Sequence, residues 1–288
     1  MLELNKIYCQ DNVEGMRLLD DESIDLTVTS PPYDNLRQYN GYSFDFENVA
    51  KELYRVTKQG GVVVWVVGDA TIKGSETGTS FRQALYFMEC GFNLHDTMIW
   101  CKDGGGAIGS NLCYTQNFEY MFVFSKGKPK SVNLIYDKQS KTYTGKQQTV
   151  KECRGGGDKG DRGLTTLTRR EFSRRNNWWY LVPNKQYGSG IHPAIFPEQL
   201  VADHIKSWSN EGDIVLDPFM GSGTTAVAAL QLSRNNMALF CIKHHRRSVY
   251  IENRKDRLVC TWKRCAIKLC VRELELNKLL DELWKKKS

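Results

Sequence analysis

Residues 217–225 have the composition of a loop that binds a ligand. In order, they are Asp217, Pro218, Phe219, Met220, Gly221, Ser222, Gly223, Thr224 and Thr225. The glycines let the backbone approach a ligand closely, and an acidic residue at the end of a strand can bind a ligand's ammonium or hydroxyl groups. The Gly-Lys-Ser/Thr ending of a phosphate loop and the glycine spacing of a dinucleotide loop are both absent. Two interpretations remain, a cofactor loop and a structural tight turn.

A second group of polar and aromatic residues follows the β-branched run 24–29. Here the chain reads Ser30, Pro31, Pro32, Tyr33. The Ser30 hydroxyl and the Pro31 carbonyl, whose geometry the next proline restricts, are two acceptors that fit an amino group with two donors, such as the exocyclic amine of a base. Tyr33 adds a flat ring on which a base can stack. The alternative is a Pro-Pro stop that ends the strand.

Alternating strand and helix patterns surround these two loops. We expect strands at 24–29, 62–67, 97–101, 118–124 and 213–216, and helices at 45–57, 79–90 and 197–208. The uninterrupted apolar run 62–67 is typical of a parallel strand that is buried on both faces. The pattern therefore predicts an α/β fold with a mostly parallel sheet. Because such sheets bind ligands at the carboxyl ends of their strands, we expect the two loops to face one crevice.

Composition and charge narrow the class further. The chain has 288 residues, of which 41% are hydrophobic and 25% charged, and this argues against a disordered, fibrous or disulfide-scaffold protein. The net charge is +7, but Lys and Arg outnumber Asp and Glu by 14 to 5 over residues 126–175 and by 15 to 6 over 234–287. A polyanionic partner is one reading of these regions, and a solvated loop followed by a basic terminal helix is the other.

The sequence also suggests a location and a redox state. No apolar run approaches the roughly 18 residues of a membrane span, and the first ten residues lack a signal-peptide pattern, so we expect a cytoplasmic protein without a membrane partner. The nine cysteines lack the spacing of zinc knuckles, and we expect reduced thiols and no metal. Steps of five would point Cys260, Cys265 and Cys270 in different directions on a helix, so they could not form one metal clamp.

Together, the 30–33 turn and the 217–225 loop resemble the β class of amino-group DNA methyltransferases, which use S-adenosylmethionine. In that class the catalytic turn comes first, the target-recognition region next and the cofactor loop last. The resemblance covers about residues 1–125 and 185–232. It implies a Rossmann-like methyltransferase fold with a catalytic half over 1–125, a basic target-recognition insertion over 126–184, and a cofactor-binding half with a basic C-terminal helix over 185–288. From its composition, the long insertion is either a functional module or a mobile segment.

Individual residues follow from the same resemblance. Ser30, Pro31, Pro32 and Tyr33 match the catalytic turn. The matches to cofactor-binding positions are Asp11, Phe196, Asp217, Pro218, Phe219, Gly221, Ser222, Gly223, Thr224 and Thr225. For Asp11 the competing interpretation is a helix N-cap, and for Phe196 it is a core aromatic residue.

One departure from the family concerns the strand after the cofactor loop. The family has an acidic residue at the end of this strand that binds the ribose hydroxyls, and Cys241 stands at that position here. A thiol is a poor acceptor, which puts cofactor affinity in question. Glu252 would substitute only in a different strand register, which we do not favour. The last segment, 274–284, has the pattern of an amphipathic helix suited to packing or self-association.

The resemblance implies transfer of a methyl group from S-adenosylmethionine to the exocyclic amine of a base flipped out of double-stranded DNA. Serine in the catalytic turn favours cytosine N4 over adenine N6. A function of another class is a non-catalytic DNA-binding protein with a degenerate cofactor site. A homodimer and a cognate restriction endonuclease stay open as partners. The resemblance also implies a bacterial or phage-encoded protein.

Overall fold

The computed structural model describes ten stretches of the chain: residues 3–32, 45–102, 113–140, 147–151, 164–168, 171–182, 197–221, 223–240, 251–254 and 257–260. By their contacts, the residues form two compact units. One comprises Met1–Asn133 with Asn177–Ser288, and the other comprises Leu134–Asn176. The second unit lies inside the predicted 126–184 insertion.

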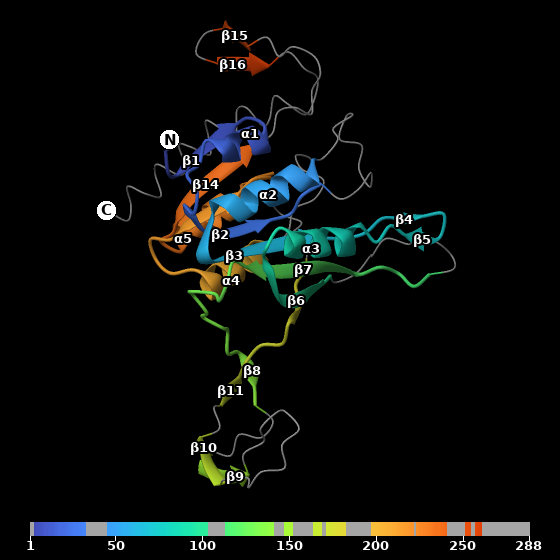
Figure 1. The fold of residues 1–288 in the computed structure, drawn as a ribbon, viewed down its shortest axis with the longest axis vertical. Coiled ribbons are helices and arrows are strands. Elements are labelled where there is room, and N and C mark those ends of the chain that lie inside the picture. Colours follow the sequence, from blue (N-terminus) through green and yellow to red (C-terminus); the bar gives the residue numbers. More distant parts are fainter. Residues whose placement is uncertain are drawn as a thin grey trace. The chain divides into compact units, whose positions relative to one another are not determined.

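An eight-stranded sheet forms the centre of the first unit (Figure 1). In spatial order its strands are β1 (Lys6–Cys9), β14 (Asn235–Phe240), β13 (Ile214–Asp217), β2 (Ile24–Thr29), β3 (Thr57–Val67), β7 (Phe118–Ser125), β6 (Asn93–Cys101) and β12 (Trp178–Tyr180). Within this sheet β7 is antiparallel to β3 and β6, and the other five neighbouring pairs are parallel. The predicted α/β fold with a mostly parallel sheet is confirmed.

The five helices in the described part of the chain are α1 (Asn12–Arg17), α2 (Phe46–Val56), α3 (Thr79–Glu89), α4 (Glu198–Trp208) and α5 (Thr224–Gln231). Side chains from α1, α2 and α3 share one apolar core with the sheet, in which Trp65, Phe87 and Phe124 are fully buried. On the opposite face, His204 of α4 lies 3.4 Å from the sulfur of Met121, and α4 packs against α5. The predicted helices at 45–57, 79–90 and 197–208 are therefore confirmed to within a residue or two.

Strand β3 begins earlier than its apolar run predicts. The sequence indicates a break at Gly60 and Gly61 before the strand, yet the structure continues the strand through both glycines from Thr57. The Gly60 amide donates to the carbonyl of Lys126, and the Lys126 amide donates to the carbonyl of Gly61. Gly60 has a φ of +79°, and a Cβ on Gly61 would lie 2.7 Å from Thr57 Cγ2, so glycine allows this close pairing.

Four small two-stranded antiparallel sheets complete the described secondary structure. Strands β4 (Thr71–Ile72) and β5 (Ser75–Glu76) pair in the first unit. The second unit contains β8 (Lys138–Gln139) paired with β11 (Phe172–Ser173), and β9 (Gln147–Lys151) paired with β10 (Leu164–Thr168). Near the C-terminus, β15 (Ile251–Arg254) pairs with β16 (Arg257–Cys260).

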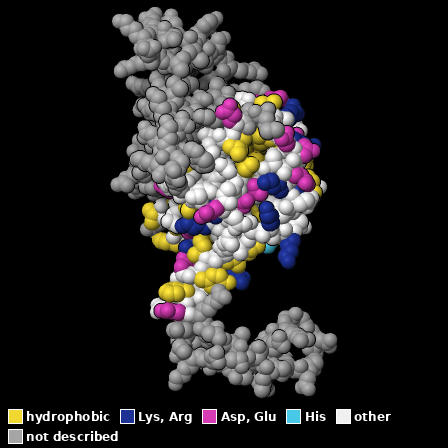
Figure 2. All heavy atoms as spheres, turned by 90° about the vertical axis from the view of Figure 1, so that its left-hand side faces the viewer, with side chains coloured by type: hydrophobic (Ala, Val, Ile, Leu, Met, Phe, Trp, Pro, Cys, Tyr) yellow, Lys and Arg dark blue, Asp and Glu magenta, His cyan; other side chains and the backbone are white. Residues whose placement is uncertain are grey.

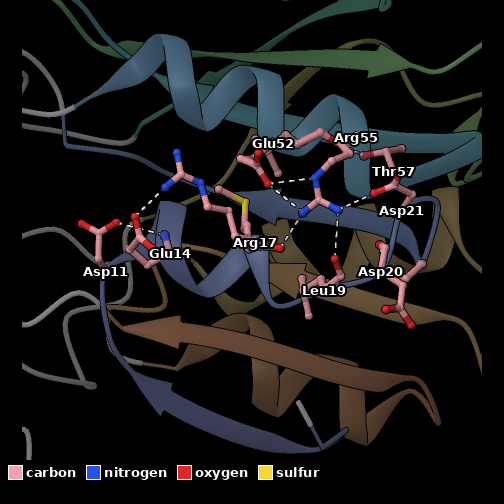
Figure 3. A network of polar contacts seen from close by, with 12 residues as sticks. Asp11, Glu14, Arg17, Leu19, Asp20, Asp21, Glu52, Arg55 and Thr57 are labelled. Carbon is pink, nitrogen blue, oxygen red and sulfur yellow. Dashed lines mark hydrogen bonds and ion pairs between the residues drawn. The ribbon is translucent and has the colours of Figure 1, made fainter. Parts of the chain in front are cut away.

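Arg55 of α2 fastens this helix to the segment between α1 and β2 (Figure 3). Its guanidinium donates hydrogen bonds to two backbone carbonyls and to two carboxylates, at distances between 2.6 and 3.0 Å. The acceptors are Met16, Leu19, Asp21 and Glu52. The planar guanidinium of arginine has enough N–H donors, in a fixed arrangement, to reach all four acceptors. The ammonium of lysine has fewer donors on one nitrogen and could not reach acceptors in this arrangement.

We expect Arg55→Ala to lower the free energy of unfolding by about 2 kcal/mol, because hydrogen bonds that involve charged groups contribute more than neutral ones. Urea unfolding followed by circular dichroism measures this change. Arg17→Ala is the matched control, since Arg17 pairs with Glu14 at 2.7 Å but its side chain is 53% exposed, against 29% for Arg55. An exposed pair contributes about 0–1 kcal/mol. Equal losses in the two variants would contradict the fastening role.

The described surface carries no extended single-sign patch on the face in Figure 2, where Lys and Arg are interspersed with Asp and Glu. Within the described residues, no helix has the length and apolar character needed to span a membrane. The same part of the chain contains no group of three or more His, Cys, Asp or Glu that could hold a metal ion.

Candidate active site

The two loops singled out from the sequence follow neighbouring strands. Strands β2 and β13 pair in parallel, with Leu26 opposite Val215 and Thr27 opposite Leu216. Ser30, Pro31 and Pro32 therefore begin at the same edge of the sheet as the loop that starts at Asp217. Pro31 is buried, and Ser30 and Pro32 are half-buried.

A buried carboxylate joins the ends of these two strands. Thr29 donates its hydroxyl hydrogen to Asp217 Oδ1 at 2.7 Å, and the Phe219 amide donates to the same oxygen at 3.0 Å. Asp217 is only 2% exposed. Burial raises the pKa of this carboxyl, while the hydrogen bonds from Thr29 and the Phe219 amide oppose the rise. Asp217 thus fixes the end of β2, which leads into the Ser-Pro-Pro turn, and the glycine loop relative to one another.

The glycine loop makes a tight turn that leads directly into α5. Gly221 and Gly223 have φ angles of +53° and +83°, a region that favours glycine. The Gly223 amide donates to the carbonyl of Met220 at 2.9 Å. Gly223 is the N-cap of α5, whose first residues Thr224 and Thr225 follow at once. The geometry fits both interpretations of this segment, the structural tight turn and the cofactor loop. The tight turn leads into a helix, and the first backbone amides of a helix are free to bind a ligand.

The remaining described residues of the loop contribute apolar contacts. Pro218 is buried, and Phe219 packs against the core with its ring 6.1 Å from that of Trp65. The loop also makes a polar contact through Thr225, the second residue of α5, whose hydroxyl donates to the carbonyl of Val28 in β2 at 3.4 Å. This contact is a second link between the glycine loop and β2.

Asp11 lies beyond β1, which runs parallel to β14 and therefore ends at the same edge of the sheet. Its carboxylate accepts hydrogen bonds from the amides of Val13 at 3.0 Å and Glu14 at 3.1 Å, and it is the N-cap of α1. The N-cap interpretation is thereby confirmed. A contact with the cofactor stays a prediction, and the position at the sheet edge is compatible with it.

Some predicted site residues lie outside the described part of the chain. They are Tyr33, Phe196, Ser222 and Cys241. The predicted helix at 274–284 also lies outside it. Strand β14 ends at Phe240, so Cys241 comes directly after it, as the sequence predicts. Glu252 lies in β15, which pairs with β16, and not at the end of β14. This agrees with the strand register in which Cys241, rather than Glu252, takes the position of the family's acidic residue.

Two polar residues at this edge escaped the sequence analysis. Thr29, the last residue of β2, is fully buried and bonds to Asp217. Asp69 follows β3 and is 4% exposed; it accepts hydrogen bonds from the Ser80 amide and hydroxyl and from the Thr77 hydroxyl. An acidic residue two positions after the apolar run 62–67 was the available signal. Its contacts explain Asp69 as the residue that holds the start of α3.

Two loops that meet at the carboxyl edge of a mostly parallel sheet define an α/β protein of the doubly wound, ligand-binding kind. Comparison with known proteins makes the class specific. Residues 24–258 match the N6/N4 methyltransferase family, described as DNA methylase. The chain is 60% identical over 215 residues to the orphan methyltransferase M.BamHII of Bacillus amyloliquefaciens, with 73% of this chain and 80% of that protein covered.

Other relatives are more distant. The type II methyltransferase M.MthZI of Methanothermobacter thermautotrophicus is 28% identical, with 82% of this chain and 73% of that protein covered. Among solved structures, the cytosine-N4-specific PvuII DNA methyltransferase gives a TM-score of 0.59 at 21% identity, covering 82% of this chain and 81% of its own. M1.HpyAVI in complex with S-adenosylmethionine gives 0.52 at 23%, covering 82% and 93%. This chain belongs to the N6/N4 family of DNA methylases.

Proposed function

We propose that this protein transfers a methyl group from S-adenosylmethionine to the exocyclic amine of a base in DNA, with cytosine N4 as the favoured target. The observation that carries this proposal is the pair of hydrogen bonds from Thr29 and Phe219 to Asp217, which fixes the Ser-Pro-Pro turn and the glycine loop at one edge of the sheet. Family membership supports the reaction class. The shared sheet edge of the two loops supports locating the reaction there.

The residues present fit the cofactor. The left-handed glycines 221 and 223 keep the loop free of side chains where the backbone must approach a ligand. We propose that the residues matched to the family's cofactor site bind or position it, namely Asp11, Phe196, Asp217, Pro218, Phe219, Gly221, Ser222, Gly223, Thr224 and Thr225. When bound, S-adenosylmethionine supplies a methyl group that is attached to a positively charged sulfonium sulfur.

The catalytic turn acts on the base. In the proposal, the Ser30 hydroxyl and the Pro31 carbonyl accept hydrogen bonds from the amine, build electron density on its nitrogen and hold it in line with the methyl group. Pro32 restricts the backbone so that the Pro31 carbonyl keeps its direction. Tyr33 stacks on the flipped base, whose extrusion from the duplex costs a few kcal/mol. A new carbon–nitrogen bond forms as the carbon–sulfur bond of the methyl donor breaks, the sulfur leaves with the electron pair of that bond as a neutral thioether, and the amine releases one proton.

The choice of base rests on the serine in the turn. The family resemblance links serine with cytosine N4 and aspartate with adenine N6, and both bases present the same kind of amine. To decide between them, unmethylated DNA is incubated with the protein and S-adenosylmethionine, digested to nucleosides and analysed by mass spectrometry. We expect N4-methylcytosine. N6-methyladenine would overturn the base assignment and keep the reaction class.

A non-catalytic DNA-binding protein is the second candidate, and the thiol of Cys241 directly after β14 is the feature that favours it. Titration with S-adenosylmethionine separates the two functions. Binding in the submillimolar range would exclude the non-catalytic one. Absence of methylated bases with the natural chain, together with their formation by a Cys241→Glu variant, would show that this position has disabled the enzyme.

DNA itself is the proposed partner of the basic insertion. In the second unit, Arg174 is exposed, whereas Arg175 donates hydrogen bonds to Asp137 and lowers the pKa of that carboxyl. We expect Arg174→Gln to weaken DNA binding and to reduce the slope of log K against log salt concentration by about 0.9, the value for one phosphate contact.

Fluorescence anisotropy over a salt series measures this slope. Arg175→Gln is the matched control, because Asp137 already neutralises that charge, and its slope should change less. A binding constant that does not depend on salt in the natural chain would contradict phosphate contacts by the insertion.

A cognate restriction endonuclease remains a proposed partner. The 60% identical relative is named an orphan methyltransferase, and several others are named type II methyltransferases.

A further inference from the structure

The Ser-Pro-Pro turn and the glycine loop follow β2 and β13, the two neighbouring strands at which the order of the sheet reverses. From β2 the chain continues to β3 on one side, and from β13 it continues to β14 on the other side. Ligands of doubly wound sheets bind beyond the carboxyl ends of the strands at such a point. Within the described residues, backbone pairing of β2 with β13 ends at Thr27. Contacts between the two strand ends beyond Thr27 therefore depend on side chains.

Two hydroxyl groups make these side-chain contacts. Thr29 donates to Asp217 Oδ1 at 2.7 Å, and Thr225 of α5 donates to the carbonyl of Val28 at 3.4 Å. The Thr29 bond is the shorter of the two, and it is buried at both ends. A buried hydrogen bond is costly to break, because its donor and acceptor are then left without partners away from water. The Thr29 hydroxyl is thus the stronger link between the end of β2 and the glycine loop.

A second threonine in β2 shows what the Thr29 hydroxyl adds. Thr27 lies two residues earlier in the strand, so its side chain projects to the same face of the sheet, and it is also fully buried. The Thr27 hydroxyl has no hydrogen-bond partner among the described residues. Burial of an unpaired hydroxyl costs free energy. The two threonines are therefore equally buried, and they differ in whether the hydroxyl makes a specific bond.

Thr29 also stands directly before Ser30, the proposed acceptor for the amine of the base. Its side chain is branched at Cβ, which restricts rotation about χ1. Its backbone pairs on the other side with Trp65 of β3. Because Thr29 is held through both its backbone and its side chain, the next residue begins from a fixed position. The distance between the Ser-Pro-Pro turn and the glycine loop therefore depends on the bond to Asp217.

We propose that Thr29 is a positioning residue for methyl transfer, whose hydroxyl acts through Asp217 to hold the Ser30 hydroxyl and the Pro31 carbonyl in line with the cofactor. This role rests on the proposed function. Loss of the Thr29 hydroxyl leaves the groups that bind the cofactor and the base in place chemically, but lets the two sets move apart. Misplacement of reacting groups by about 1 Å can reduce a rate about 100-fold. The effect should therefore lie in the rate of the bound complex and not in the affinity for the cofactor.

Thr29→Val tests this role, because valine keeps the branched shape of threonine and lacks the hydroxyl. In a single-turnover assay with saturating cofactor and DNA, we expect the rate to fall about 10- to 100-fold, with the dissociation constant of S-adenosylmethionine within about threefold of the natural value. Thr29→Ser keeps the hydroxyl and should recover the rate to within about fivefold. Thr27→Val is the matched control in the same strand, and its rate should stay within about twofold of the natural one because it removes an unpaired hydroxyl.

A double-mutant cycle tests the hydrogen bond without any measurement of activity. Thr29→Val and Asp217→Ala each break the same bond, so the double variant should lose less stability in urea unfolding than the sum of the two single losses. Circular dichroism confirms that each variant is folded. Additive losses would show that the two side chains are not coupled and would overturn the proposal.

The kinetic outcomes separate this role from the proposed function. If the natural chain methylates DNA and Thr29→Val is equally fast, or if Thr29→Ser is as slow as Thr29→Val, the positioning role is overturned. A loss that lies wholly in cofactor affinity overturns it as well. A natural chain that binds the cofactor and transfers no methyl group to DNA would overturn the proposed function itself, and the positioning role with it.

Discussion

Ser30→Ala is expected to reduce the rate of methyl transfer to DNA by about 100- to 1,000-fold, the usual effect of deleting one preorganised polar group that stabilises charge in the transition state. The hydroxyl is one of two proposed acceptors for the amine, and alanine leaves only the Pro31 carbonyl. A single-turnover assay with labelled S-adenosylmethionine measures the chemical step.

Ser23→Ala provides a matched control at the other end of the same strand. The Ser23 hydroxyl donates to the carbonyl of Asp20 at 2.7 Å, before β2 begins. Its loss should leave the methyl-transfer rate within about twofold of the natural one, as is usual for a surface substitution. Cofactor titrations on both variants locate the effect. An unchanged rate in Ser30→Ala would remove this residue from the mechanism.

Asp217→Ala should be the second large effect, with losses in both stability and activity. It leaves the Thr29 hydroxyl and the Phe219 amide without their acceptor, at about 1–3 kcal/mol for each buried donor. The strand end and the glycine loop then lose their link, and misplaced groups in an active site typically reduce the rate about 100-fold. Urea unfolding, cofactor titration and single-turnover rates separate the contributions.

Asp217→Asn is the control, because an amide oxygen can still accept both hydrogen bonds. It also isolates a pH effect. Burial raises the pKa of Asp217 above its ordinary value of 3.8, so the folded state holds this proton to higher pH than the unfolded chain does. The protonated Asp217 carboxyl therefore contributes to the stability of the folded state. This contribution is complete below the ordinary pKa and is lost as pH rises through the raised pKa.

The natural chain should therefore lose stability relative to the Asn variant as pH increases. Urea unfolding at a series of pH values that starts at the ordinary pKa of 3.8 and extends to neutral pH measures this difference. Parallel pH profiles in the two proteins would contradict the raised pKa. A cofactor affinity in the Asn variant as low as in the Ala variant would show that the negative charge, and not only the hydrogen bonds, serves the cofactor site.

Local sequence patterns were sufficient for most of the sheet. The run 24–29 corresponds residue for residue to β2, and Asp45 caps the helix predicted over 45–57. Strand β12 was missed, because Trp178, Trp179 and Tyr180 follow a long basic stretch without periodicity. What makes them a strand is pairing with β6, far away in the sequence. The extension of β3 through Gly60 has a similar origin in its pairing with Lys126.

By itself, the sequence determined the class of fold, the order of the two loops and the residues proposed for the chemistry, because strand periodicity and glycine or proline turns are local properties. The tertiary structure alone decided that Thr29 is the partner of Asp217, 188 positions later in the chain. It also decided that Phe81, Leu85 and Met88 of α3 are exposed, whereas Ala84 and Phe87 of the same helix are buried. Both depend on which strands become neighbours and which faces helices cover, and long-range packing settles these relations.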